Sequence, residues 1–463
     1  MSDRYLRQMI IEGWDQSKLY NSSVAVVGSG PVAISTLVAL SMLGVGDIDI
    51  YSNRILKQYD PSEFLYFGEE PGVYKVDALE RIMKKSNPDL EGNITNLKMG
   101  VTWNFLSDSE LILMDKSAGK TRYNLVVDAT NNPSIESLML QYGISRMVPI
   151  INASAMTYKG EVKVVTPDGK EISRGALSTE YAYKPQDPVM AGLIGGLVGE
   201  EARRLLMPLK GESIEDIDVN LNFLSRKIVG QEDDYENLNP DYRKSVLVVG
   251  AGSLGVNVVR ELVQRGVKKI WLYDADRVEE LNLNRQYEYT LADSVGQPKA
   301  LMLKEVASQY NPAVQIIAKN EFFTGEFKSA LPDAIFRCTD SFKTSAMLNA
   351  TAHKYNIPLF YAATSKDDGQ AYAVIPGKTP GLDDIFDVNK AAEEEIVPAG
   401  CVEEPTPSVG TVNMIMSSAM VGLFDIWCAG AEVPRGYLNY SNKEFNRFSF
   451  VETNFKTAQN KGV

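Results

Sequence analysis

A glycine-rich turn in the second half of this 463-residue chain is followed by a dense run of charged and amide side chains. The turn is VLVVGAGSLG, in which a β-branched run ends in Gly250, Gly252 and Gly255. This spacing predicts a strand-to-helix turn whose backbone approaches a phosphate at a helix N-terminus. The glycines alone do not distinguish NAD from another nucleotide, because each requires the same turn.

The residues after the turn favour a triphosphate. A ribose needs one acid, whereas this segment supplies many more polar groups: Asp274, Asp276, Asn282, Arg285, Gln286 and Lys299. Arginine and lysine offset charge on phosphates and on a departing pyrophosphate, so the cluster suits phosphoryl or nucleotidyl transfer. Asp340 ends the predicted strand AIFRCTD at the carboxyl edge of a sheet, where it is a candidate Mg²⁺ ligand.

Composition excludes several other classes. The net charge of −13 argues against a nucleic-acid surface. Three cysteines without close pairs provide neither a disulfide framework nor a four-cysteine zinc site, and a single histidine makes His-based triads poor candidates. The polar start of the chain and the interrupted apolar run from Met414 to Trp427 lead us to expect no secretory signal, no membrane span and a cytoplasmic location.

The chain repeats itself. The segment 24–52 parallels 246–274 in the order strand, glycine turn, helix and strand, and LVVDATN (125–131) parallels AIFRCTD (334–340). All-apolar strands alternating with helices predict an α/β fold with two tandem Rossmann-like domains. The expected organisation is a first domain at 1–230, a charged linker at 231–244, a second domain at 245–430, and a C-terminal strand pair and tail at 431–463.

The two copies differ where the chemistry would be. Counted from the first glycine of each turn, the positions of Asp274 and Arg285 are taken in the first copy by Ser52 and Glu63, with Ala33 replacing the third glycine. In the parallel segments LVVDATN and AIFRCTD, the position of Asp340 is taken by Asn131. We therefore predict that the first half keeps the fold and has lost the triphosphate site.

These residues resemble a known family. GAGSLG, DADRVEELNLNRQ, GQPKA and CTD, together with the N-terminal RYLRQ, resemble the adenylation domain shared by MoeB, ThiF and the ubiquitin-activating enzymes, over roughly residues 4–430. The resemblance implies ATP and Mg²⁺ as cofactors. It implies further that Arg7 reaches into the site of the neighbouring domain, that Asp274 binds the ribose, that Asn282, Arg285 and Lys299 bind phosphates, and that Asp340 binds Mg²⁺.

A fused pair with one working site is similar to the ubiquitin-activating enzymes, in which the two domains act as an internal pseudo-dimer. The chain lacks the CxxC pairs for zinc found in MoeB and ThiF, and it lacks the large catalytic-cysteine and ubiquitin-fold domains of the eukaryotic enzyme. It therefore resembles the minimal activating enzymes of bacterial and archaeal ubiquitin-like operons.

One cysteine is a candidate nucleophile. Cys401 lies in CVEEPTPSVG ahead of the last predicted helix, and this segment looks like the thioester-forming segment of compact activating enzymes. A thiol near a helix N-terminus would have its thiolate favoured. Cys338, inside a strand, and Cys428, near the end of an apolar helix, are expected to be packing residues.

The resulting hypothesis is ATP-dependent adenylation of the C-terminal carboxylate of a ubiquitin-like protein with a Gly-type tail, followed by a thioester on Cys401 and transfer to a conjugating enzyme. No nucleic-acid or membrane partner is expected. The alternative is a MoeB- or ThiF-like adenylyltransferase of a sulfur carrier or a peptide, without a thioester. An NAD-dependent oxidoreductase and a non-catalytic nucleotide-binding scaffold are further alternatives.

Overall fold

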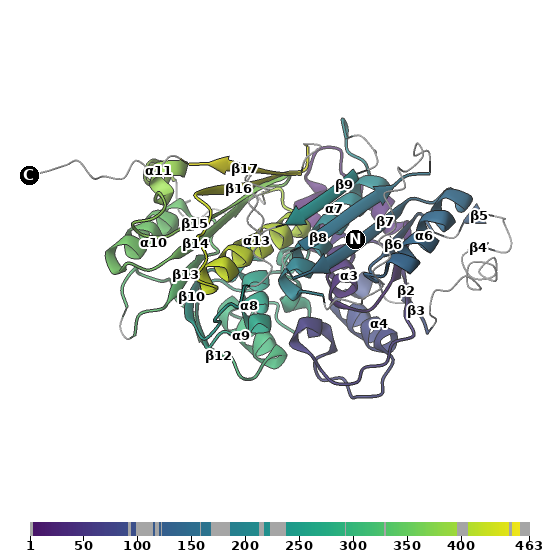
Figure 1. Cartoon of the computed structure of the whole chain (residues 1–463), viewed down its shortest axis with the longest axis horizontal. Coiled ribbons are helices and arrows are strands. Elements are labelled where there is room, and N and C mark those ends of the chain that lie inside the picture. The colour runs from purple at the N-terminus through teal and green to yellow at the C-terminus, as the bar shows by residue number, and fades with distance from the viewer. Residues whose placement is uncertain are drawn as a thin grey trace, which may run out of the picture.

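Two α/β sheets of the same design lie side by side in the computed structural model (Figure 1). The structure describes residues 3–90, 94–98, 114–115, 120–121, 123–157, 159–167, 186–212, 217–222, 238–291, 293–327, 330–395, 406–443 and 447–453.

The first half forms a seven-stranded sheet in the order β3-β2-β1-β6-β7-β8-β9. Its strands are β1 (Ser23–Val27), β2 (Asp47–Tyr51), β3 (Ile94–Leu97), β6 (Leu125–Asp128), β7 (Ile150–Met156), β8 (Lys159–Val165) and β9 (Ile217–Asn222), with a separate small pair β4 (Met114–Asp115) and β5 (Lys120–Thr121). Its helices are η1 (Asp3–Tyr5), α1 (Leu6–Met9), α2 (Gln16–Tyr20), α3 (Pro31–Leu43), η2 (Pro61–Tyr66), α4 (Lys75–Ser86), η3 (Pro88–Leu90), α6 (Pro133–Arg146) and α7 (Pro188–Leu206).

The second half repeats this order as β12-β11-β10-β13-β14-β15-β16-β17. Its strands are β10 (Ser245–Val249), β11 (Lys269–Tyr273), β12 (Gln315–Lys319), β13 (Ala334–Arg337), β14 (Leu359–Thr364), β15 (Asp368–Val374), β16 (Gly436–Ser441) and β17 (Phe448–Glu452). Its helices are α8 (Ser253–Arg265), η5 (Glu280–Asn282), η6 (Tyr287–Leu291), α9 (Lys299–Tyr310), α10 (Phe342–Tyr355), α11 (Leu382–Phe386), α12 (Val388–Glu394) and α13 (Gly410–Cys428).

Strand pairing confirms the predicted Rossmann-like repeat. β1 pairs in parallel with β2 and β6, and β10 pairs in parallel with β11 and β13. β1 and β10 are almost wholly buried, as expected for central strands covered on both faces. Their carboxyl ends therefore meet the ends of β2 and β11 at one sheet edge, where this fold binds ligands. Antiparallel strands extend each sheet on the other side, and β16 and β17 pair there at 436–452.

The two halves share a large apolar core, and each half also has a smaller buried cluster of its own. A single cluster of buried side chains contains Leu37 and Leu197 from the first half and Val258 and Val412 from the second. Helix α7 packs against α3 of its own half and against α13 of the other (Figure 1). Glycines allow this close approach: a Cβ on Gly196 would lie 2.7 Å from the Ile415 side chain.

Helix α13 is long and apolar enough to cross a membrane, although its Ser, Gly and Asp residues had led us to expect otherwise. In the structure, 94% of its apolar window is buried, against α7, α8 and the second sheet. The helix is thus packed as a core element.

Buried ion pairs also join the halves. Arg265 of α8 contacts Asp187, which caps α7, at 2.6 Å, and Asp425 of α13 at 2.6 Å. Arg447, beside β17, donates from Nε to Glu201 of α7 at 3.0 Å. Removing Arg265 would leave two buried carboxylates without this cation, which typically costs about 3–5 kcal/mol.

The junction contains a carboxyl that predicts a pH effect. Glu261 is fully buried between Ser418, whose hydroxyl donates to it at 2.6 Å, and Arg260 at 3.7 Å. Burial raises the pKa of Glu261 to about 8, against the lowering effects of Arg260, Ser418 and Arg265. The folded chain therefore holds a proton here that the unfolded chain releases above pH 4.5, so stability falls as pH rises from about 4.5 to 8.

We expect Glu261→Gln to weaken this decline. Between pH 5 and pH 8.5, the free energy of unfolding of wild type should fall by about 2–4 kcal/mol more than that of the variant. Chemical denaturation at both pH values measures it. Glu326→Gln is the matched control, because that exposed carboxyl has a lowered pKa. Equal pH dependence of wild type and Glu261→Gln would refute the assignment.

Candidate functional site

The glycine turn of the second half has the geometry of an anion site. Gly250 has a φ of +103°, and a Cβ there would overlap the carbonyl oxygen of Cys338. Gly252 caps α8 at its N-terminus, and a Cβ there would meet no atom within 4 Å. Helix α8 thus begins beside open space and without a side-chain cap, and the N–H groups of a first helical turn favour negative charge.

Asp274 lies at the edge of this turn, directly after β11. Its two carboxylate oxygens accept from backbone N–H groups, Oδ2 from Ala251 at 2.6 Å and Oδ1 from Asp276 at 2.8 Å. Burial raises the pKa of Asp274, and these hydrogen bonds together with Lys299 oppose that rise. The carboxylate is thus fixed beside the glycine turn, as a ribose ligand requires.

Lys299 begins α9 and points back to the same edge. Its ammonium lies 3.1 Å from Oδ2 of Asp276, an exposed carboxylate, while Lys299 itself is buried. Tyr289 holds the two segments together, since its hydroxyl donates to the carbonyl of Ala251 at 2.7 Å. The ammonium of Lys299 would therefore lie close to a phosphate bound at the turn.

Arg285 provides a buried positive charge. Its Nη1 donates to the Leu281 carbonyl at 2.6 Å and to Oδ1 of Asn284 at 3.0 Å. Burial and the nearby charge of Arg7 lower the pKa of Arg285 to about 9, and Asp340 acts in the opposite direction. Two neighbouring guanidinium groups repel each other, so an anion between them would be stabilised.

Arg7 reaches this site from the other half of the chain. Its Nη1 donates to Oγ1 of Thr406 at 3.1 Å, and its carbonyl accepts from the Ser408 N–H at 3.1 Å. The Nε of Arg7 is buried and makes no hydrogen bond. The N-terminal RYLRQ segment therefore lies against the segment that leads into α13, with its guanidinium within electrostatic reach of Arg285.

Two other predicted residues are placed differently. Asn282 is buried, and its Oδ1 accepts from the Glu279 N–H at 3.0 Å, which closes its own 3₁₀ turn. Asp340 is exposed after β13 and influences the pKa of Arg285. Within the described part of the chain, no three His, Cys, Asp or Glu side chains gather to hold a metal. A Mg²⁺ ion held by Asp340 would take other ligands from substrate phosphates, which is a common Mg²⁺ arrangement.

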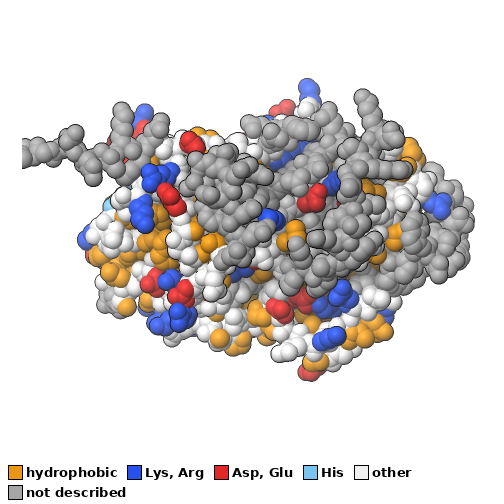
Figure 2. Space-filling view, in the orientation of Figure 1, with side chains coloured by type: hydrophobic (Ala, Val, Ile, Leu, Met, Phe, Trp, Pro, Cys, Tyr) orange, Lys and Arg blue, Asp and Glu red, His pale blue; other side chains and the backbone are white. Residues whose placement is uncertain are grey.

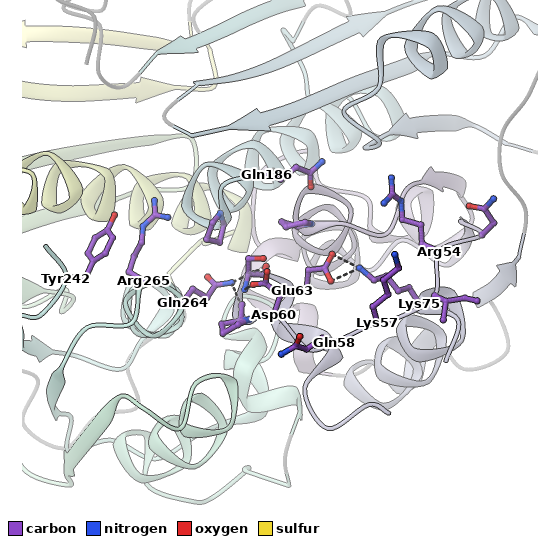
Figure 3. A pocket seen from close by; sticks show the side chains of 16 residues that line it. Arg54, Lys57, Gln58, Asp60, Glu63, Lys75, Gln186, Tyr242, Gln264 and Arg265 are labelled. Carbon is purple, nitrogen blue, oxygen red and sulfur yellow. Dashed lines mark hydrogen bonds and ion pairs between the residues drawn. The ribbon is translucent and has the colours of Figure 1, made fainter. Parts of the chain in front are cut away.

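The first half has the turn but not an open anion site. Oε1 of Gln186 accepts from the Val32 N–H at 3.0 Å, at the start of α3, and a Cβ on Gly30 would lie 2.8 Å from the same oxygen. A neutral amide thus lies where the second half is open (Figure 3). Ser52, the counterpart of Asp274, bonds to the Ser29 hydroxyl at 2.8 Å.

The structure also corrects the sequence comparison of the halves. Lys75 begins α4 as Lys299 begins α9, and their N–H groups donate equivalently, to Arg54 and Asp276, both at 2.9 Å. The first half thus keeps this lysine, a residue that counting from the glycines missed because the preceding loop is two residues shorter. Nζ of Lys75 is paired with Glu63 at 2.5 Å (Figure 3).

The same comparison changes the counterpart of Arg285. The hydroxyls of Tyr66 and Tyr289 both donate at 2.7 Å to the carbonyl that follows the first glycine of their turn. Counting back from these tyrosines, Arg285 corresponds to Ser62, one position before the predicted Glu63. Neither Ser62 nor Glu63 supplies an arginine, so the prediction that the first half lacks this charge is unchanged.

A cavity of about 870 Å³ remains beside this modified turn, between the two halves. Its walls carry both charges and several amides (Figure 3); they include Arg54, Lys57, Glu63, Gln186 and Gln264. Its cationic wall is partly neutralised, because Glu63 pairs with Lys75 and Arg265 is held by two aspartates. It does not reproduce the cluster around Arg285.

The structure describes two of the three cysteines. Cys401 lies outside the described residues. Cys338 and Cys428 are both buried, and burial raises the pKa of both thiols, that of Cys338 to about 12. Neither would form a thiolate readily near neutral pH.

The outer surface agrees with the acidic composition. On the described part of the face in Figure 2, basic and acidic side chains are interspersed, and no broad basic surface is visible.

The turn geometry predicts different effects for two glycines. Gly250→Ala should destabilise the protein by about 2–3 kcal/mol, because it strains a positive φ and overlaps the Cys338 carbonyl. Gly252→Ala should cost about 1 kcal/mol or less, because its Cβ enters open space. Denaturant titration compares the two variants, and a larger loss for Gly252→Ala would contradict the geometry.

Comparisons with known proteins agree with this arrangement. A sequence profile of the ThiF family matches residues 4–232 and again 224–461. A sulfur carrier protein adenylyltransferase of Thermus thermophilus is 40% identical over 133 residues, 28% of this chain and 48% of that protein. The ThiS adenylyltransferase of Escherichia coli is 31% identical over 200 residues, 42% of this chain and 75% of that protein.

A third relative, the SAMP-activating enzyme E1 of Haloferax volcanii, is 32% identical over 159 residues, 34% of this chain and 58% of that protein. The match thus spans about half the length of the Thermus relative. Because the family profile matches in tandem over nearly the whole length, the chain belongs to the ThiF family and contains two copies of its domain.

Proposed function

We propose that this protein is an ATP-dependent adenylyltransferase that activates the C-terminal carboxylate of a small ubiquitin-like protein. The observation that carries the proposal is the placement of Arg7, from the first half, beside the buried Arg285 of the second. Relatives named as adenylyltransferases and as an activating enzyme support the reaction class. A cytoplasmic location remains part of the proposal.

In the proposed site each residue has one task. The N–H groups at the start of α8 and the ammonium of Lys299 bind the phosphates, and Asp274 accepts from the ribose hydroxyls. Asp340 would hold Mg²⁺, which would neutralise phosphate charge when bound. Asn282 would act through the shape of its turn, because its oxygen already accepts from Glu279.

The first step exchanges one bond to phosphorus for another. A carboxylate oxygen of the ubiquitin-like protein attacks the α-phosphorus of ATP, and the bond to the pyrophosphate oxygen breaks. The products are an acyl-adenylate and pyrophosphate. Negative charge that grows on the phosphate oxygens would be offset by Arg7, Arg285 and Lys299, whose positions are fixed before reaction.

The proposed second step uses Cys401. Its thiolate attacks the acyl carbon of the adenylate, AMP leaves, and a thioester forms that passes to a conjugating-enzyme cysteine. The residues that follow Cys401 support this step. Arg7 donates from Nη1 to Oγ1 of Thr406 at 3.1 Å, and the Ser408 N–H donates to the Arg7 carbonyl. The chain five residues beyond Cys401 is thereby held at the arginine of the proposed site.

The second candidate function stops at the adenylate. Two of the relatives are named as sulfur carrier adenylyltransferases, which favours a sulfur-carrier protein as an alternative substrate. In either function, the first half would act as scaffold and donor of Arg7, so the tandem domains would work as an internal pseudo-dimer.

Adenylation is tested by ATP–pyrophosphate exchange with a small ubiquitin-like protein that ends in a Gly-type tail. Arg285→Ala and Asp340→Ala should each reduce exchange about 100-fold or more, because the first removes a positive charge at the phosphates and the second removes the proposed Mg²⁺ ligand. Their counterparts in the first half, Ser62→Ala and Asn131→Ala, should change exchange less than about 3-fold, since the first half has no open anion site. Equal losses in both halves would overturn the assignment of a single working site.

The thioester step is tested separately on a non-reducing gel with ATP, Mg²⁺ and the same partner. Wild type should form a thiol-sensitive adduct, and Cys401→Ala should lose the adduct while keeping pyrophosphate exchange. Cys338→Ala serves as the control thiol, because it is buried with a raised pKa. Exchange without any adduct in wild type would favour the sulfur-carrier function.

A further inference from the structure

We infer that Gln8 and Asn284 form a positioning pair that holds the Arg285 guanidinium for ATP, so the first half controls the working site through an amide link as well as through Arg7. The inference rests on the proposed function. Gln8 follows Arg7 in the RYLRQ segment, and Asn284 precedes Arg285 in NLNRQ. Each motif would thus contribute one charge and one amide.

The link is a continuous series of hydrogen bonds between the halves. Gln8 donates from Nε2 to the Leu43 carbonyl, at the end of α3, at 3.0 Å. Its Oε1 accepts from Nδ2 of Asn284 at 3.3 Å, and Oδ1 of Asn284 accepts from Nη1 of Arg285 at 3.0 Å. Both amides are fully buried at 0% exposure, so no water competes for these bonds.

The direction of every bond in the series is fixed. Arg285 is donor only, so the oxygen of Asn284 must face it and the amide nitrogen must face Gln8. Gln8 can accept there because its own nitrogen is engaged by the Leu43 carbonyl and by Oε1 of Gln16, 2.7 Å away. Two further hydrogen bonds hold Gln16 in place. Trp14 donates from Nε1 to Oε1 of Gln16 at 3.0 Å, and Gln16 donates from Nε2 to the Leu43 carbonyl at 2.8 Å.

Arg285 needs such support because its surroundings are unfavourable for its charge. It is 6% exposed and lies near the positive charge of Arg7. Its Nη1 is the donor to both the Leu281 carbonyl and Asn284, and neither partner carries a negative charge. The pair therefore orients the guanidinium without neutralising it, which leaves its charge for a phosphate.

The bond between Asn284 and Arg285 differs from a similar bond elsewhere in the second half, where the arginine is paired with a carboxylate. Asn257 makes the same kind of bond, accepting from Nη2 of Arg260 at 2.7 Å, and is 3% exposed. Arg260, however, is paired with Glu288 at 2.7 Å, so its charge is neutralised. Asn257 is therefore the matched control for an Asn-to-Arg bond without a role in binding anions.

The test measures the dissociation constant of ATP·Mg²⁺ by equilibrium dialysis, together with KM and kcat in pyrophosphate exchange. Asn284→Ala and Gln8→Met should each weaken ATP·Mg²⁺ binding about 5- to 20-fold, as expected for losing a hydrogen bond to a charged group. The dissociation constant of the double variant should exceed that of either single variant by no more than about 2-fold, because both substitutions break the same series of hydrogen bonds. Asn257→Ala should change the constant less than 2-fold, even if its melting temperature falls.

A double-mutant cycle separates positioning from general stability. In an Arg285→Ala background, Asn284→Ala should change the ATP·Mg²⁺ dissociation constant less than 2-fold, because the residue it positions is gone. An equal loss in both backgrounds, or wild-type affinity in folded Asn284→Ala and Gln8→Met, would overturn the inference. If Asn284→Ala fails to fold, Gln8→Met decides by the same criteria. Wild type that does not bind ATP·Mg²⁺ would overturn the proposed function itself, and the inference with it.

Discussion

The close approach of helix α7 to α3 and α13 is the constraint on which the rest of the molecule depends. Glycines on α7 let the three backbones approach where larger side chains would collide, and one continuous apolar core results. Arg265 and the two aspartates it joins then fix the helices at their ends. In this arrangement, the N-terminal segment of the first half lies against the segment that leads into α13.

The two halves show how one backbone plan supports two different sites. Both have a glycine with positive φ after the first strand, a helix that begins at the second glycine, and a tyrosine that ties the turn to the following loop. The side chains decide the rest. Gln186 lies over the start of α3, whereas the start of α8 faces open space, and Lys75 is paired with Glu63. The first half thus differs from the second by added contacts at its turn as well as by its different residues.

Much of the fold could be predicted from the sequence, because apolar strands alternating with helices and an internal repeat determine the sheet order. The cluster around Arg285 and its neighbour Arg7 followed from motif residues in the second half and in RYLRQ. Gln186 could not be predicted, since it reaches the turn from a distant segment without any motif. Lys75 was missed because a shorter loop shifts it by two positions. The amide series from Gln8 to Arg285 depends on side-chain directions that spacing does not contain.

The shared core of the two halves has a consequence for how the site behaves with concentration. In a dimer of separate chains, an arginine supplied by the neighbour is lost on dilution, because the partner dissociates. Here Arg7 and its target are parts of one folded unit, so the effective concentration of the guanidinium at Arg285 is set by geometry alone. In the proposed function, such a chain would keep its site assembled at any cellular abundance, because the contributing arginine cannot dissociate from it.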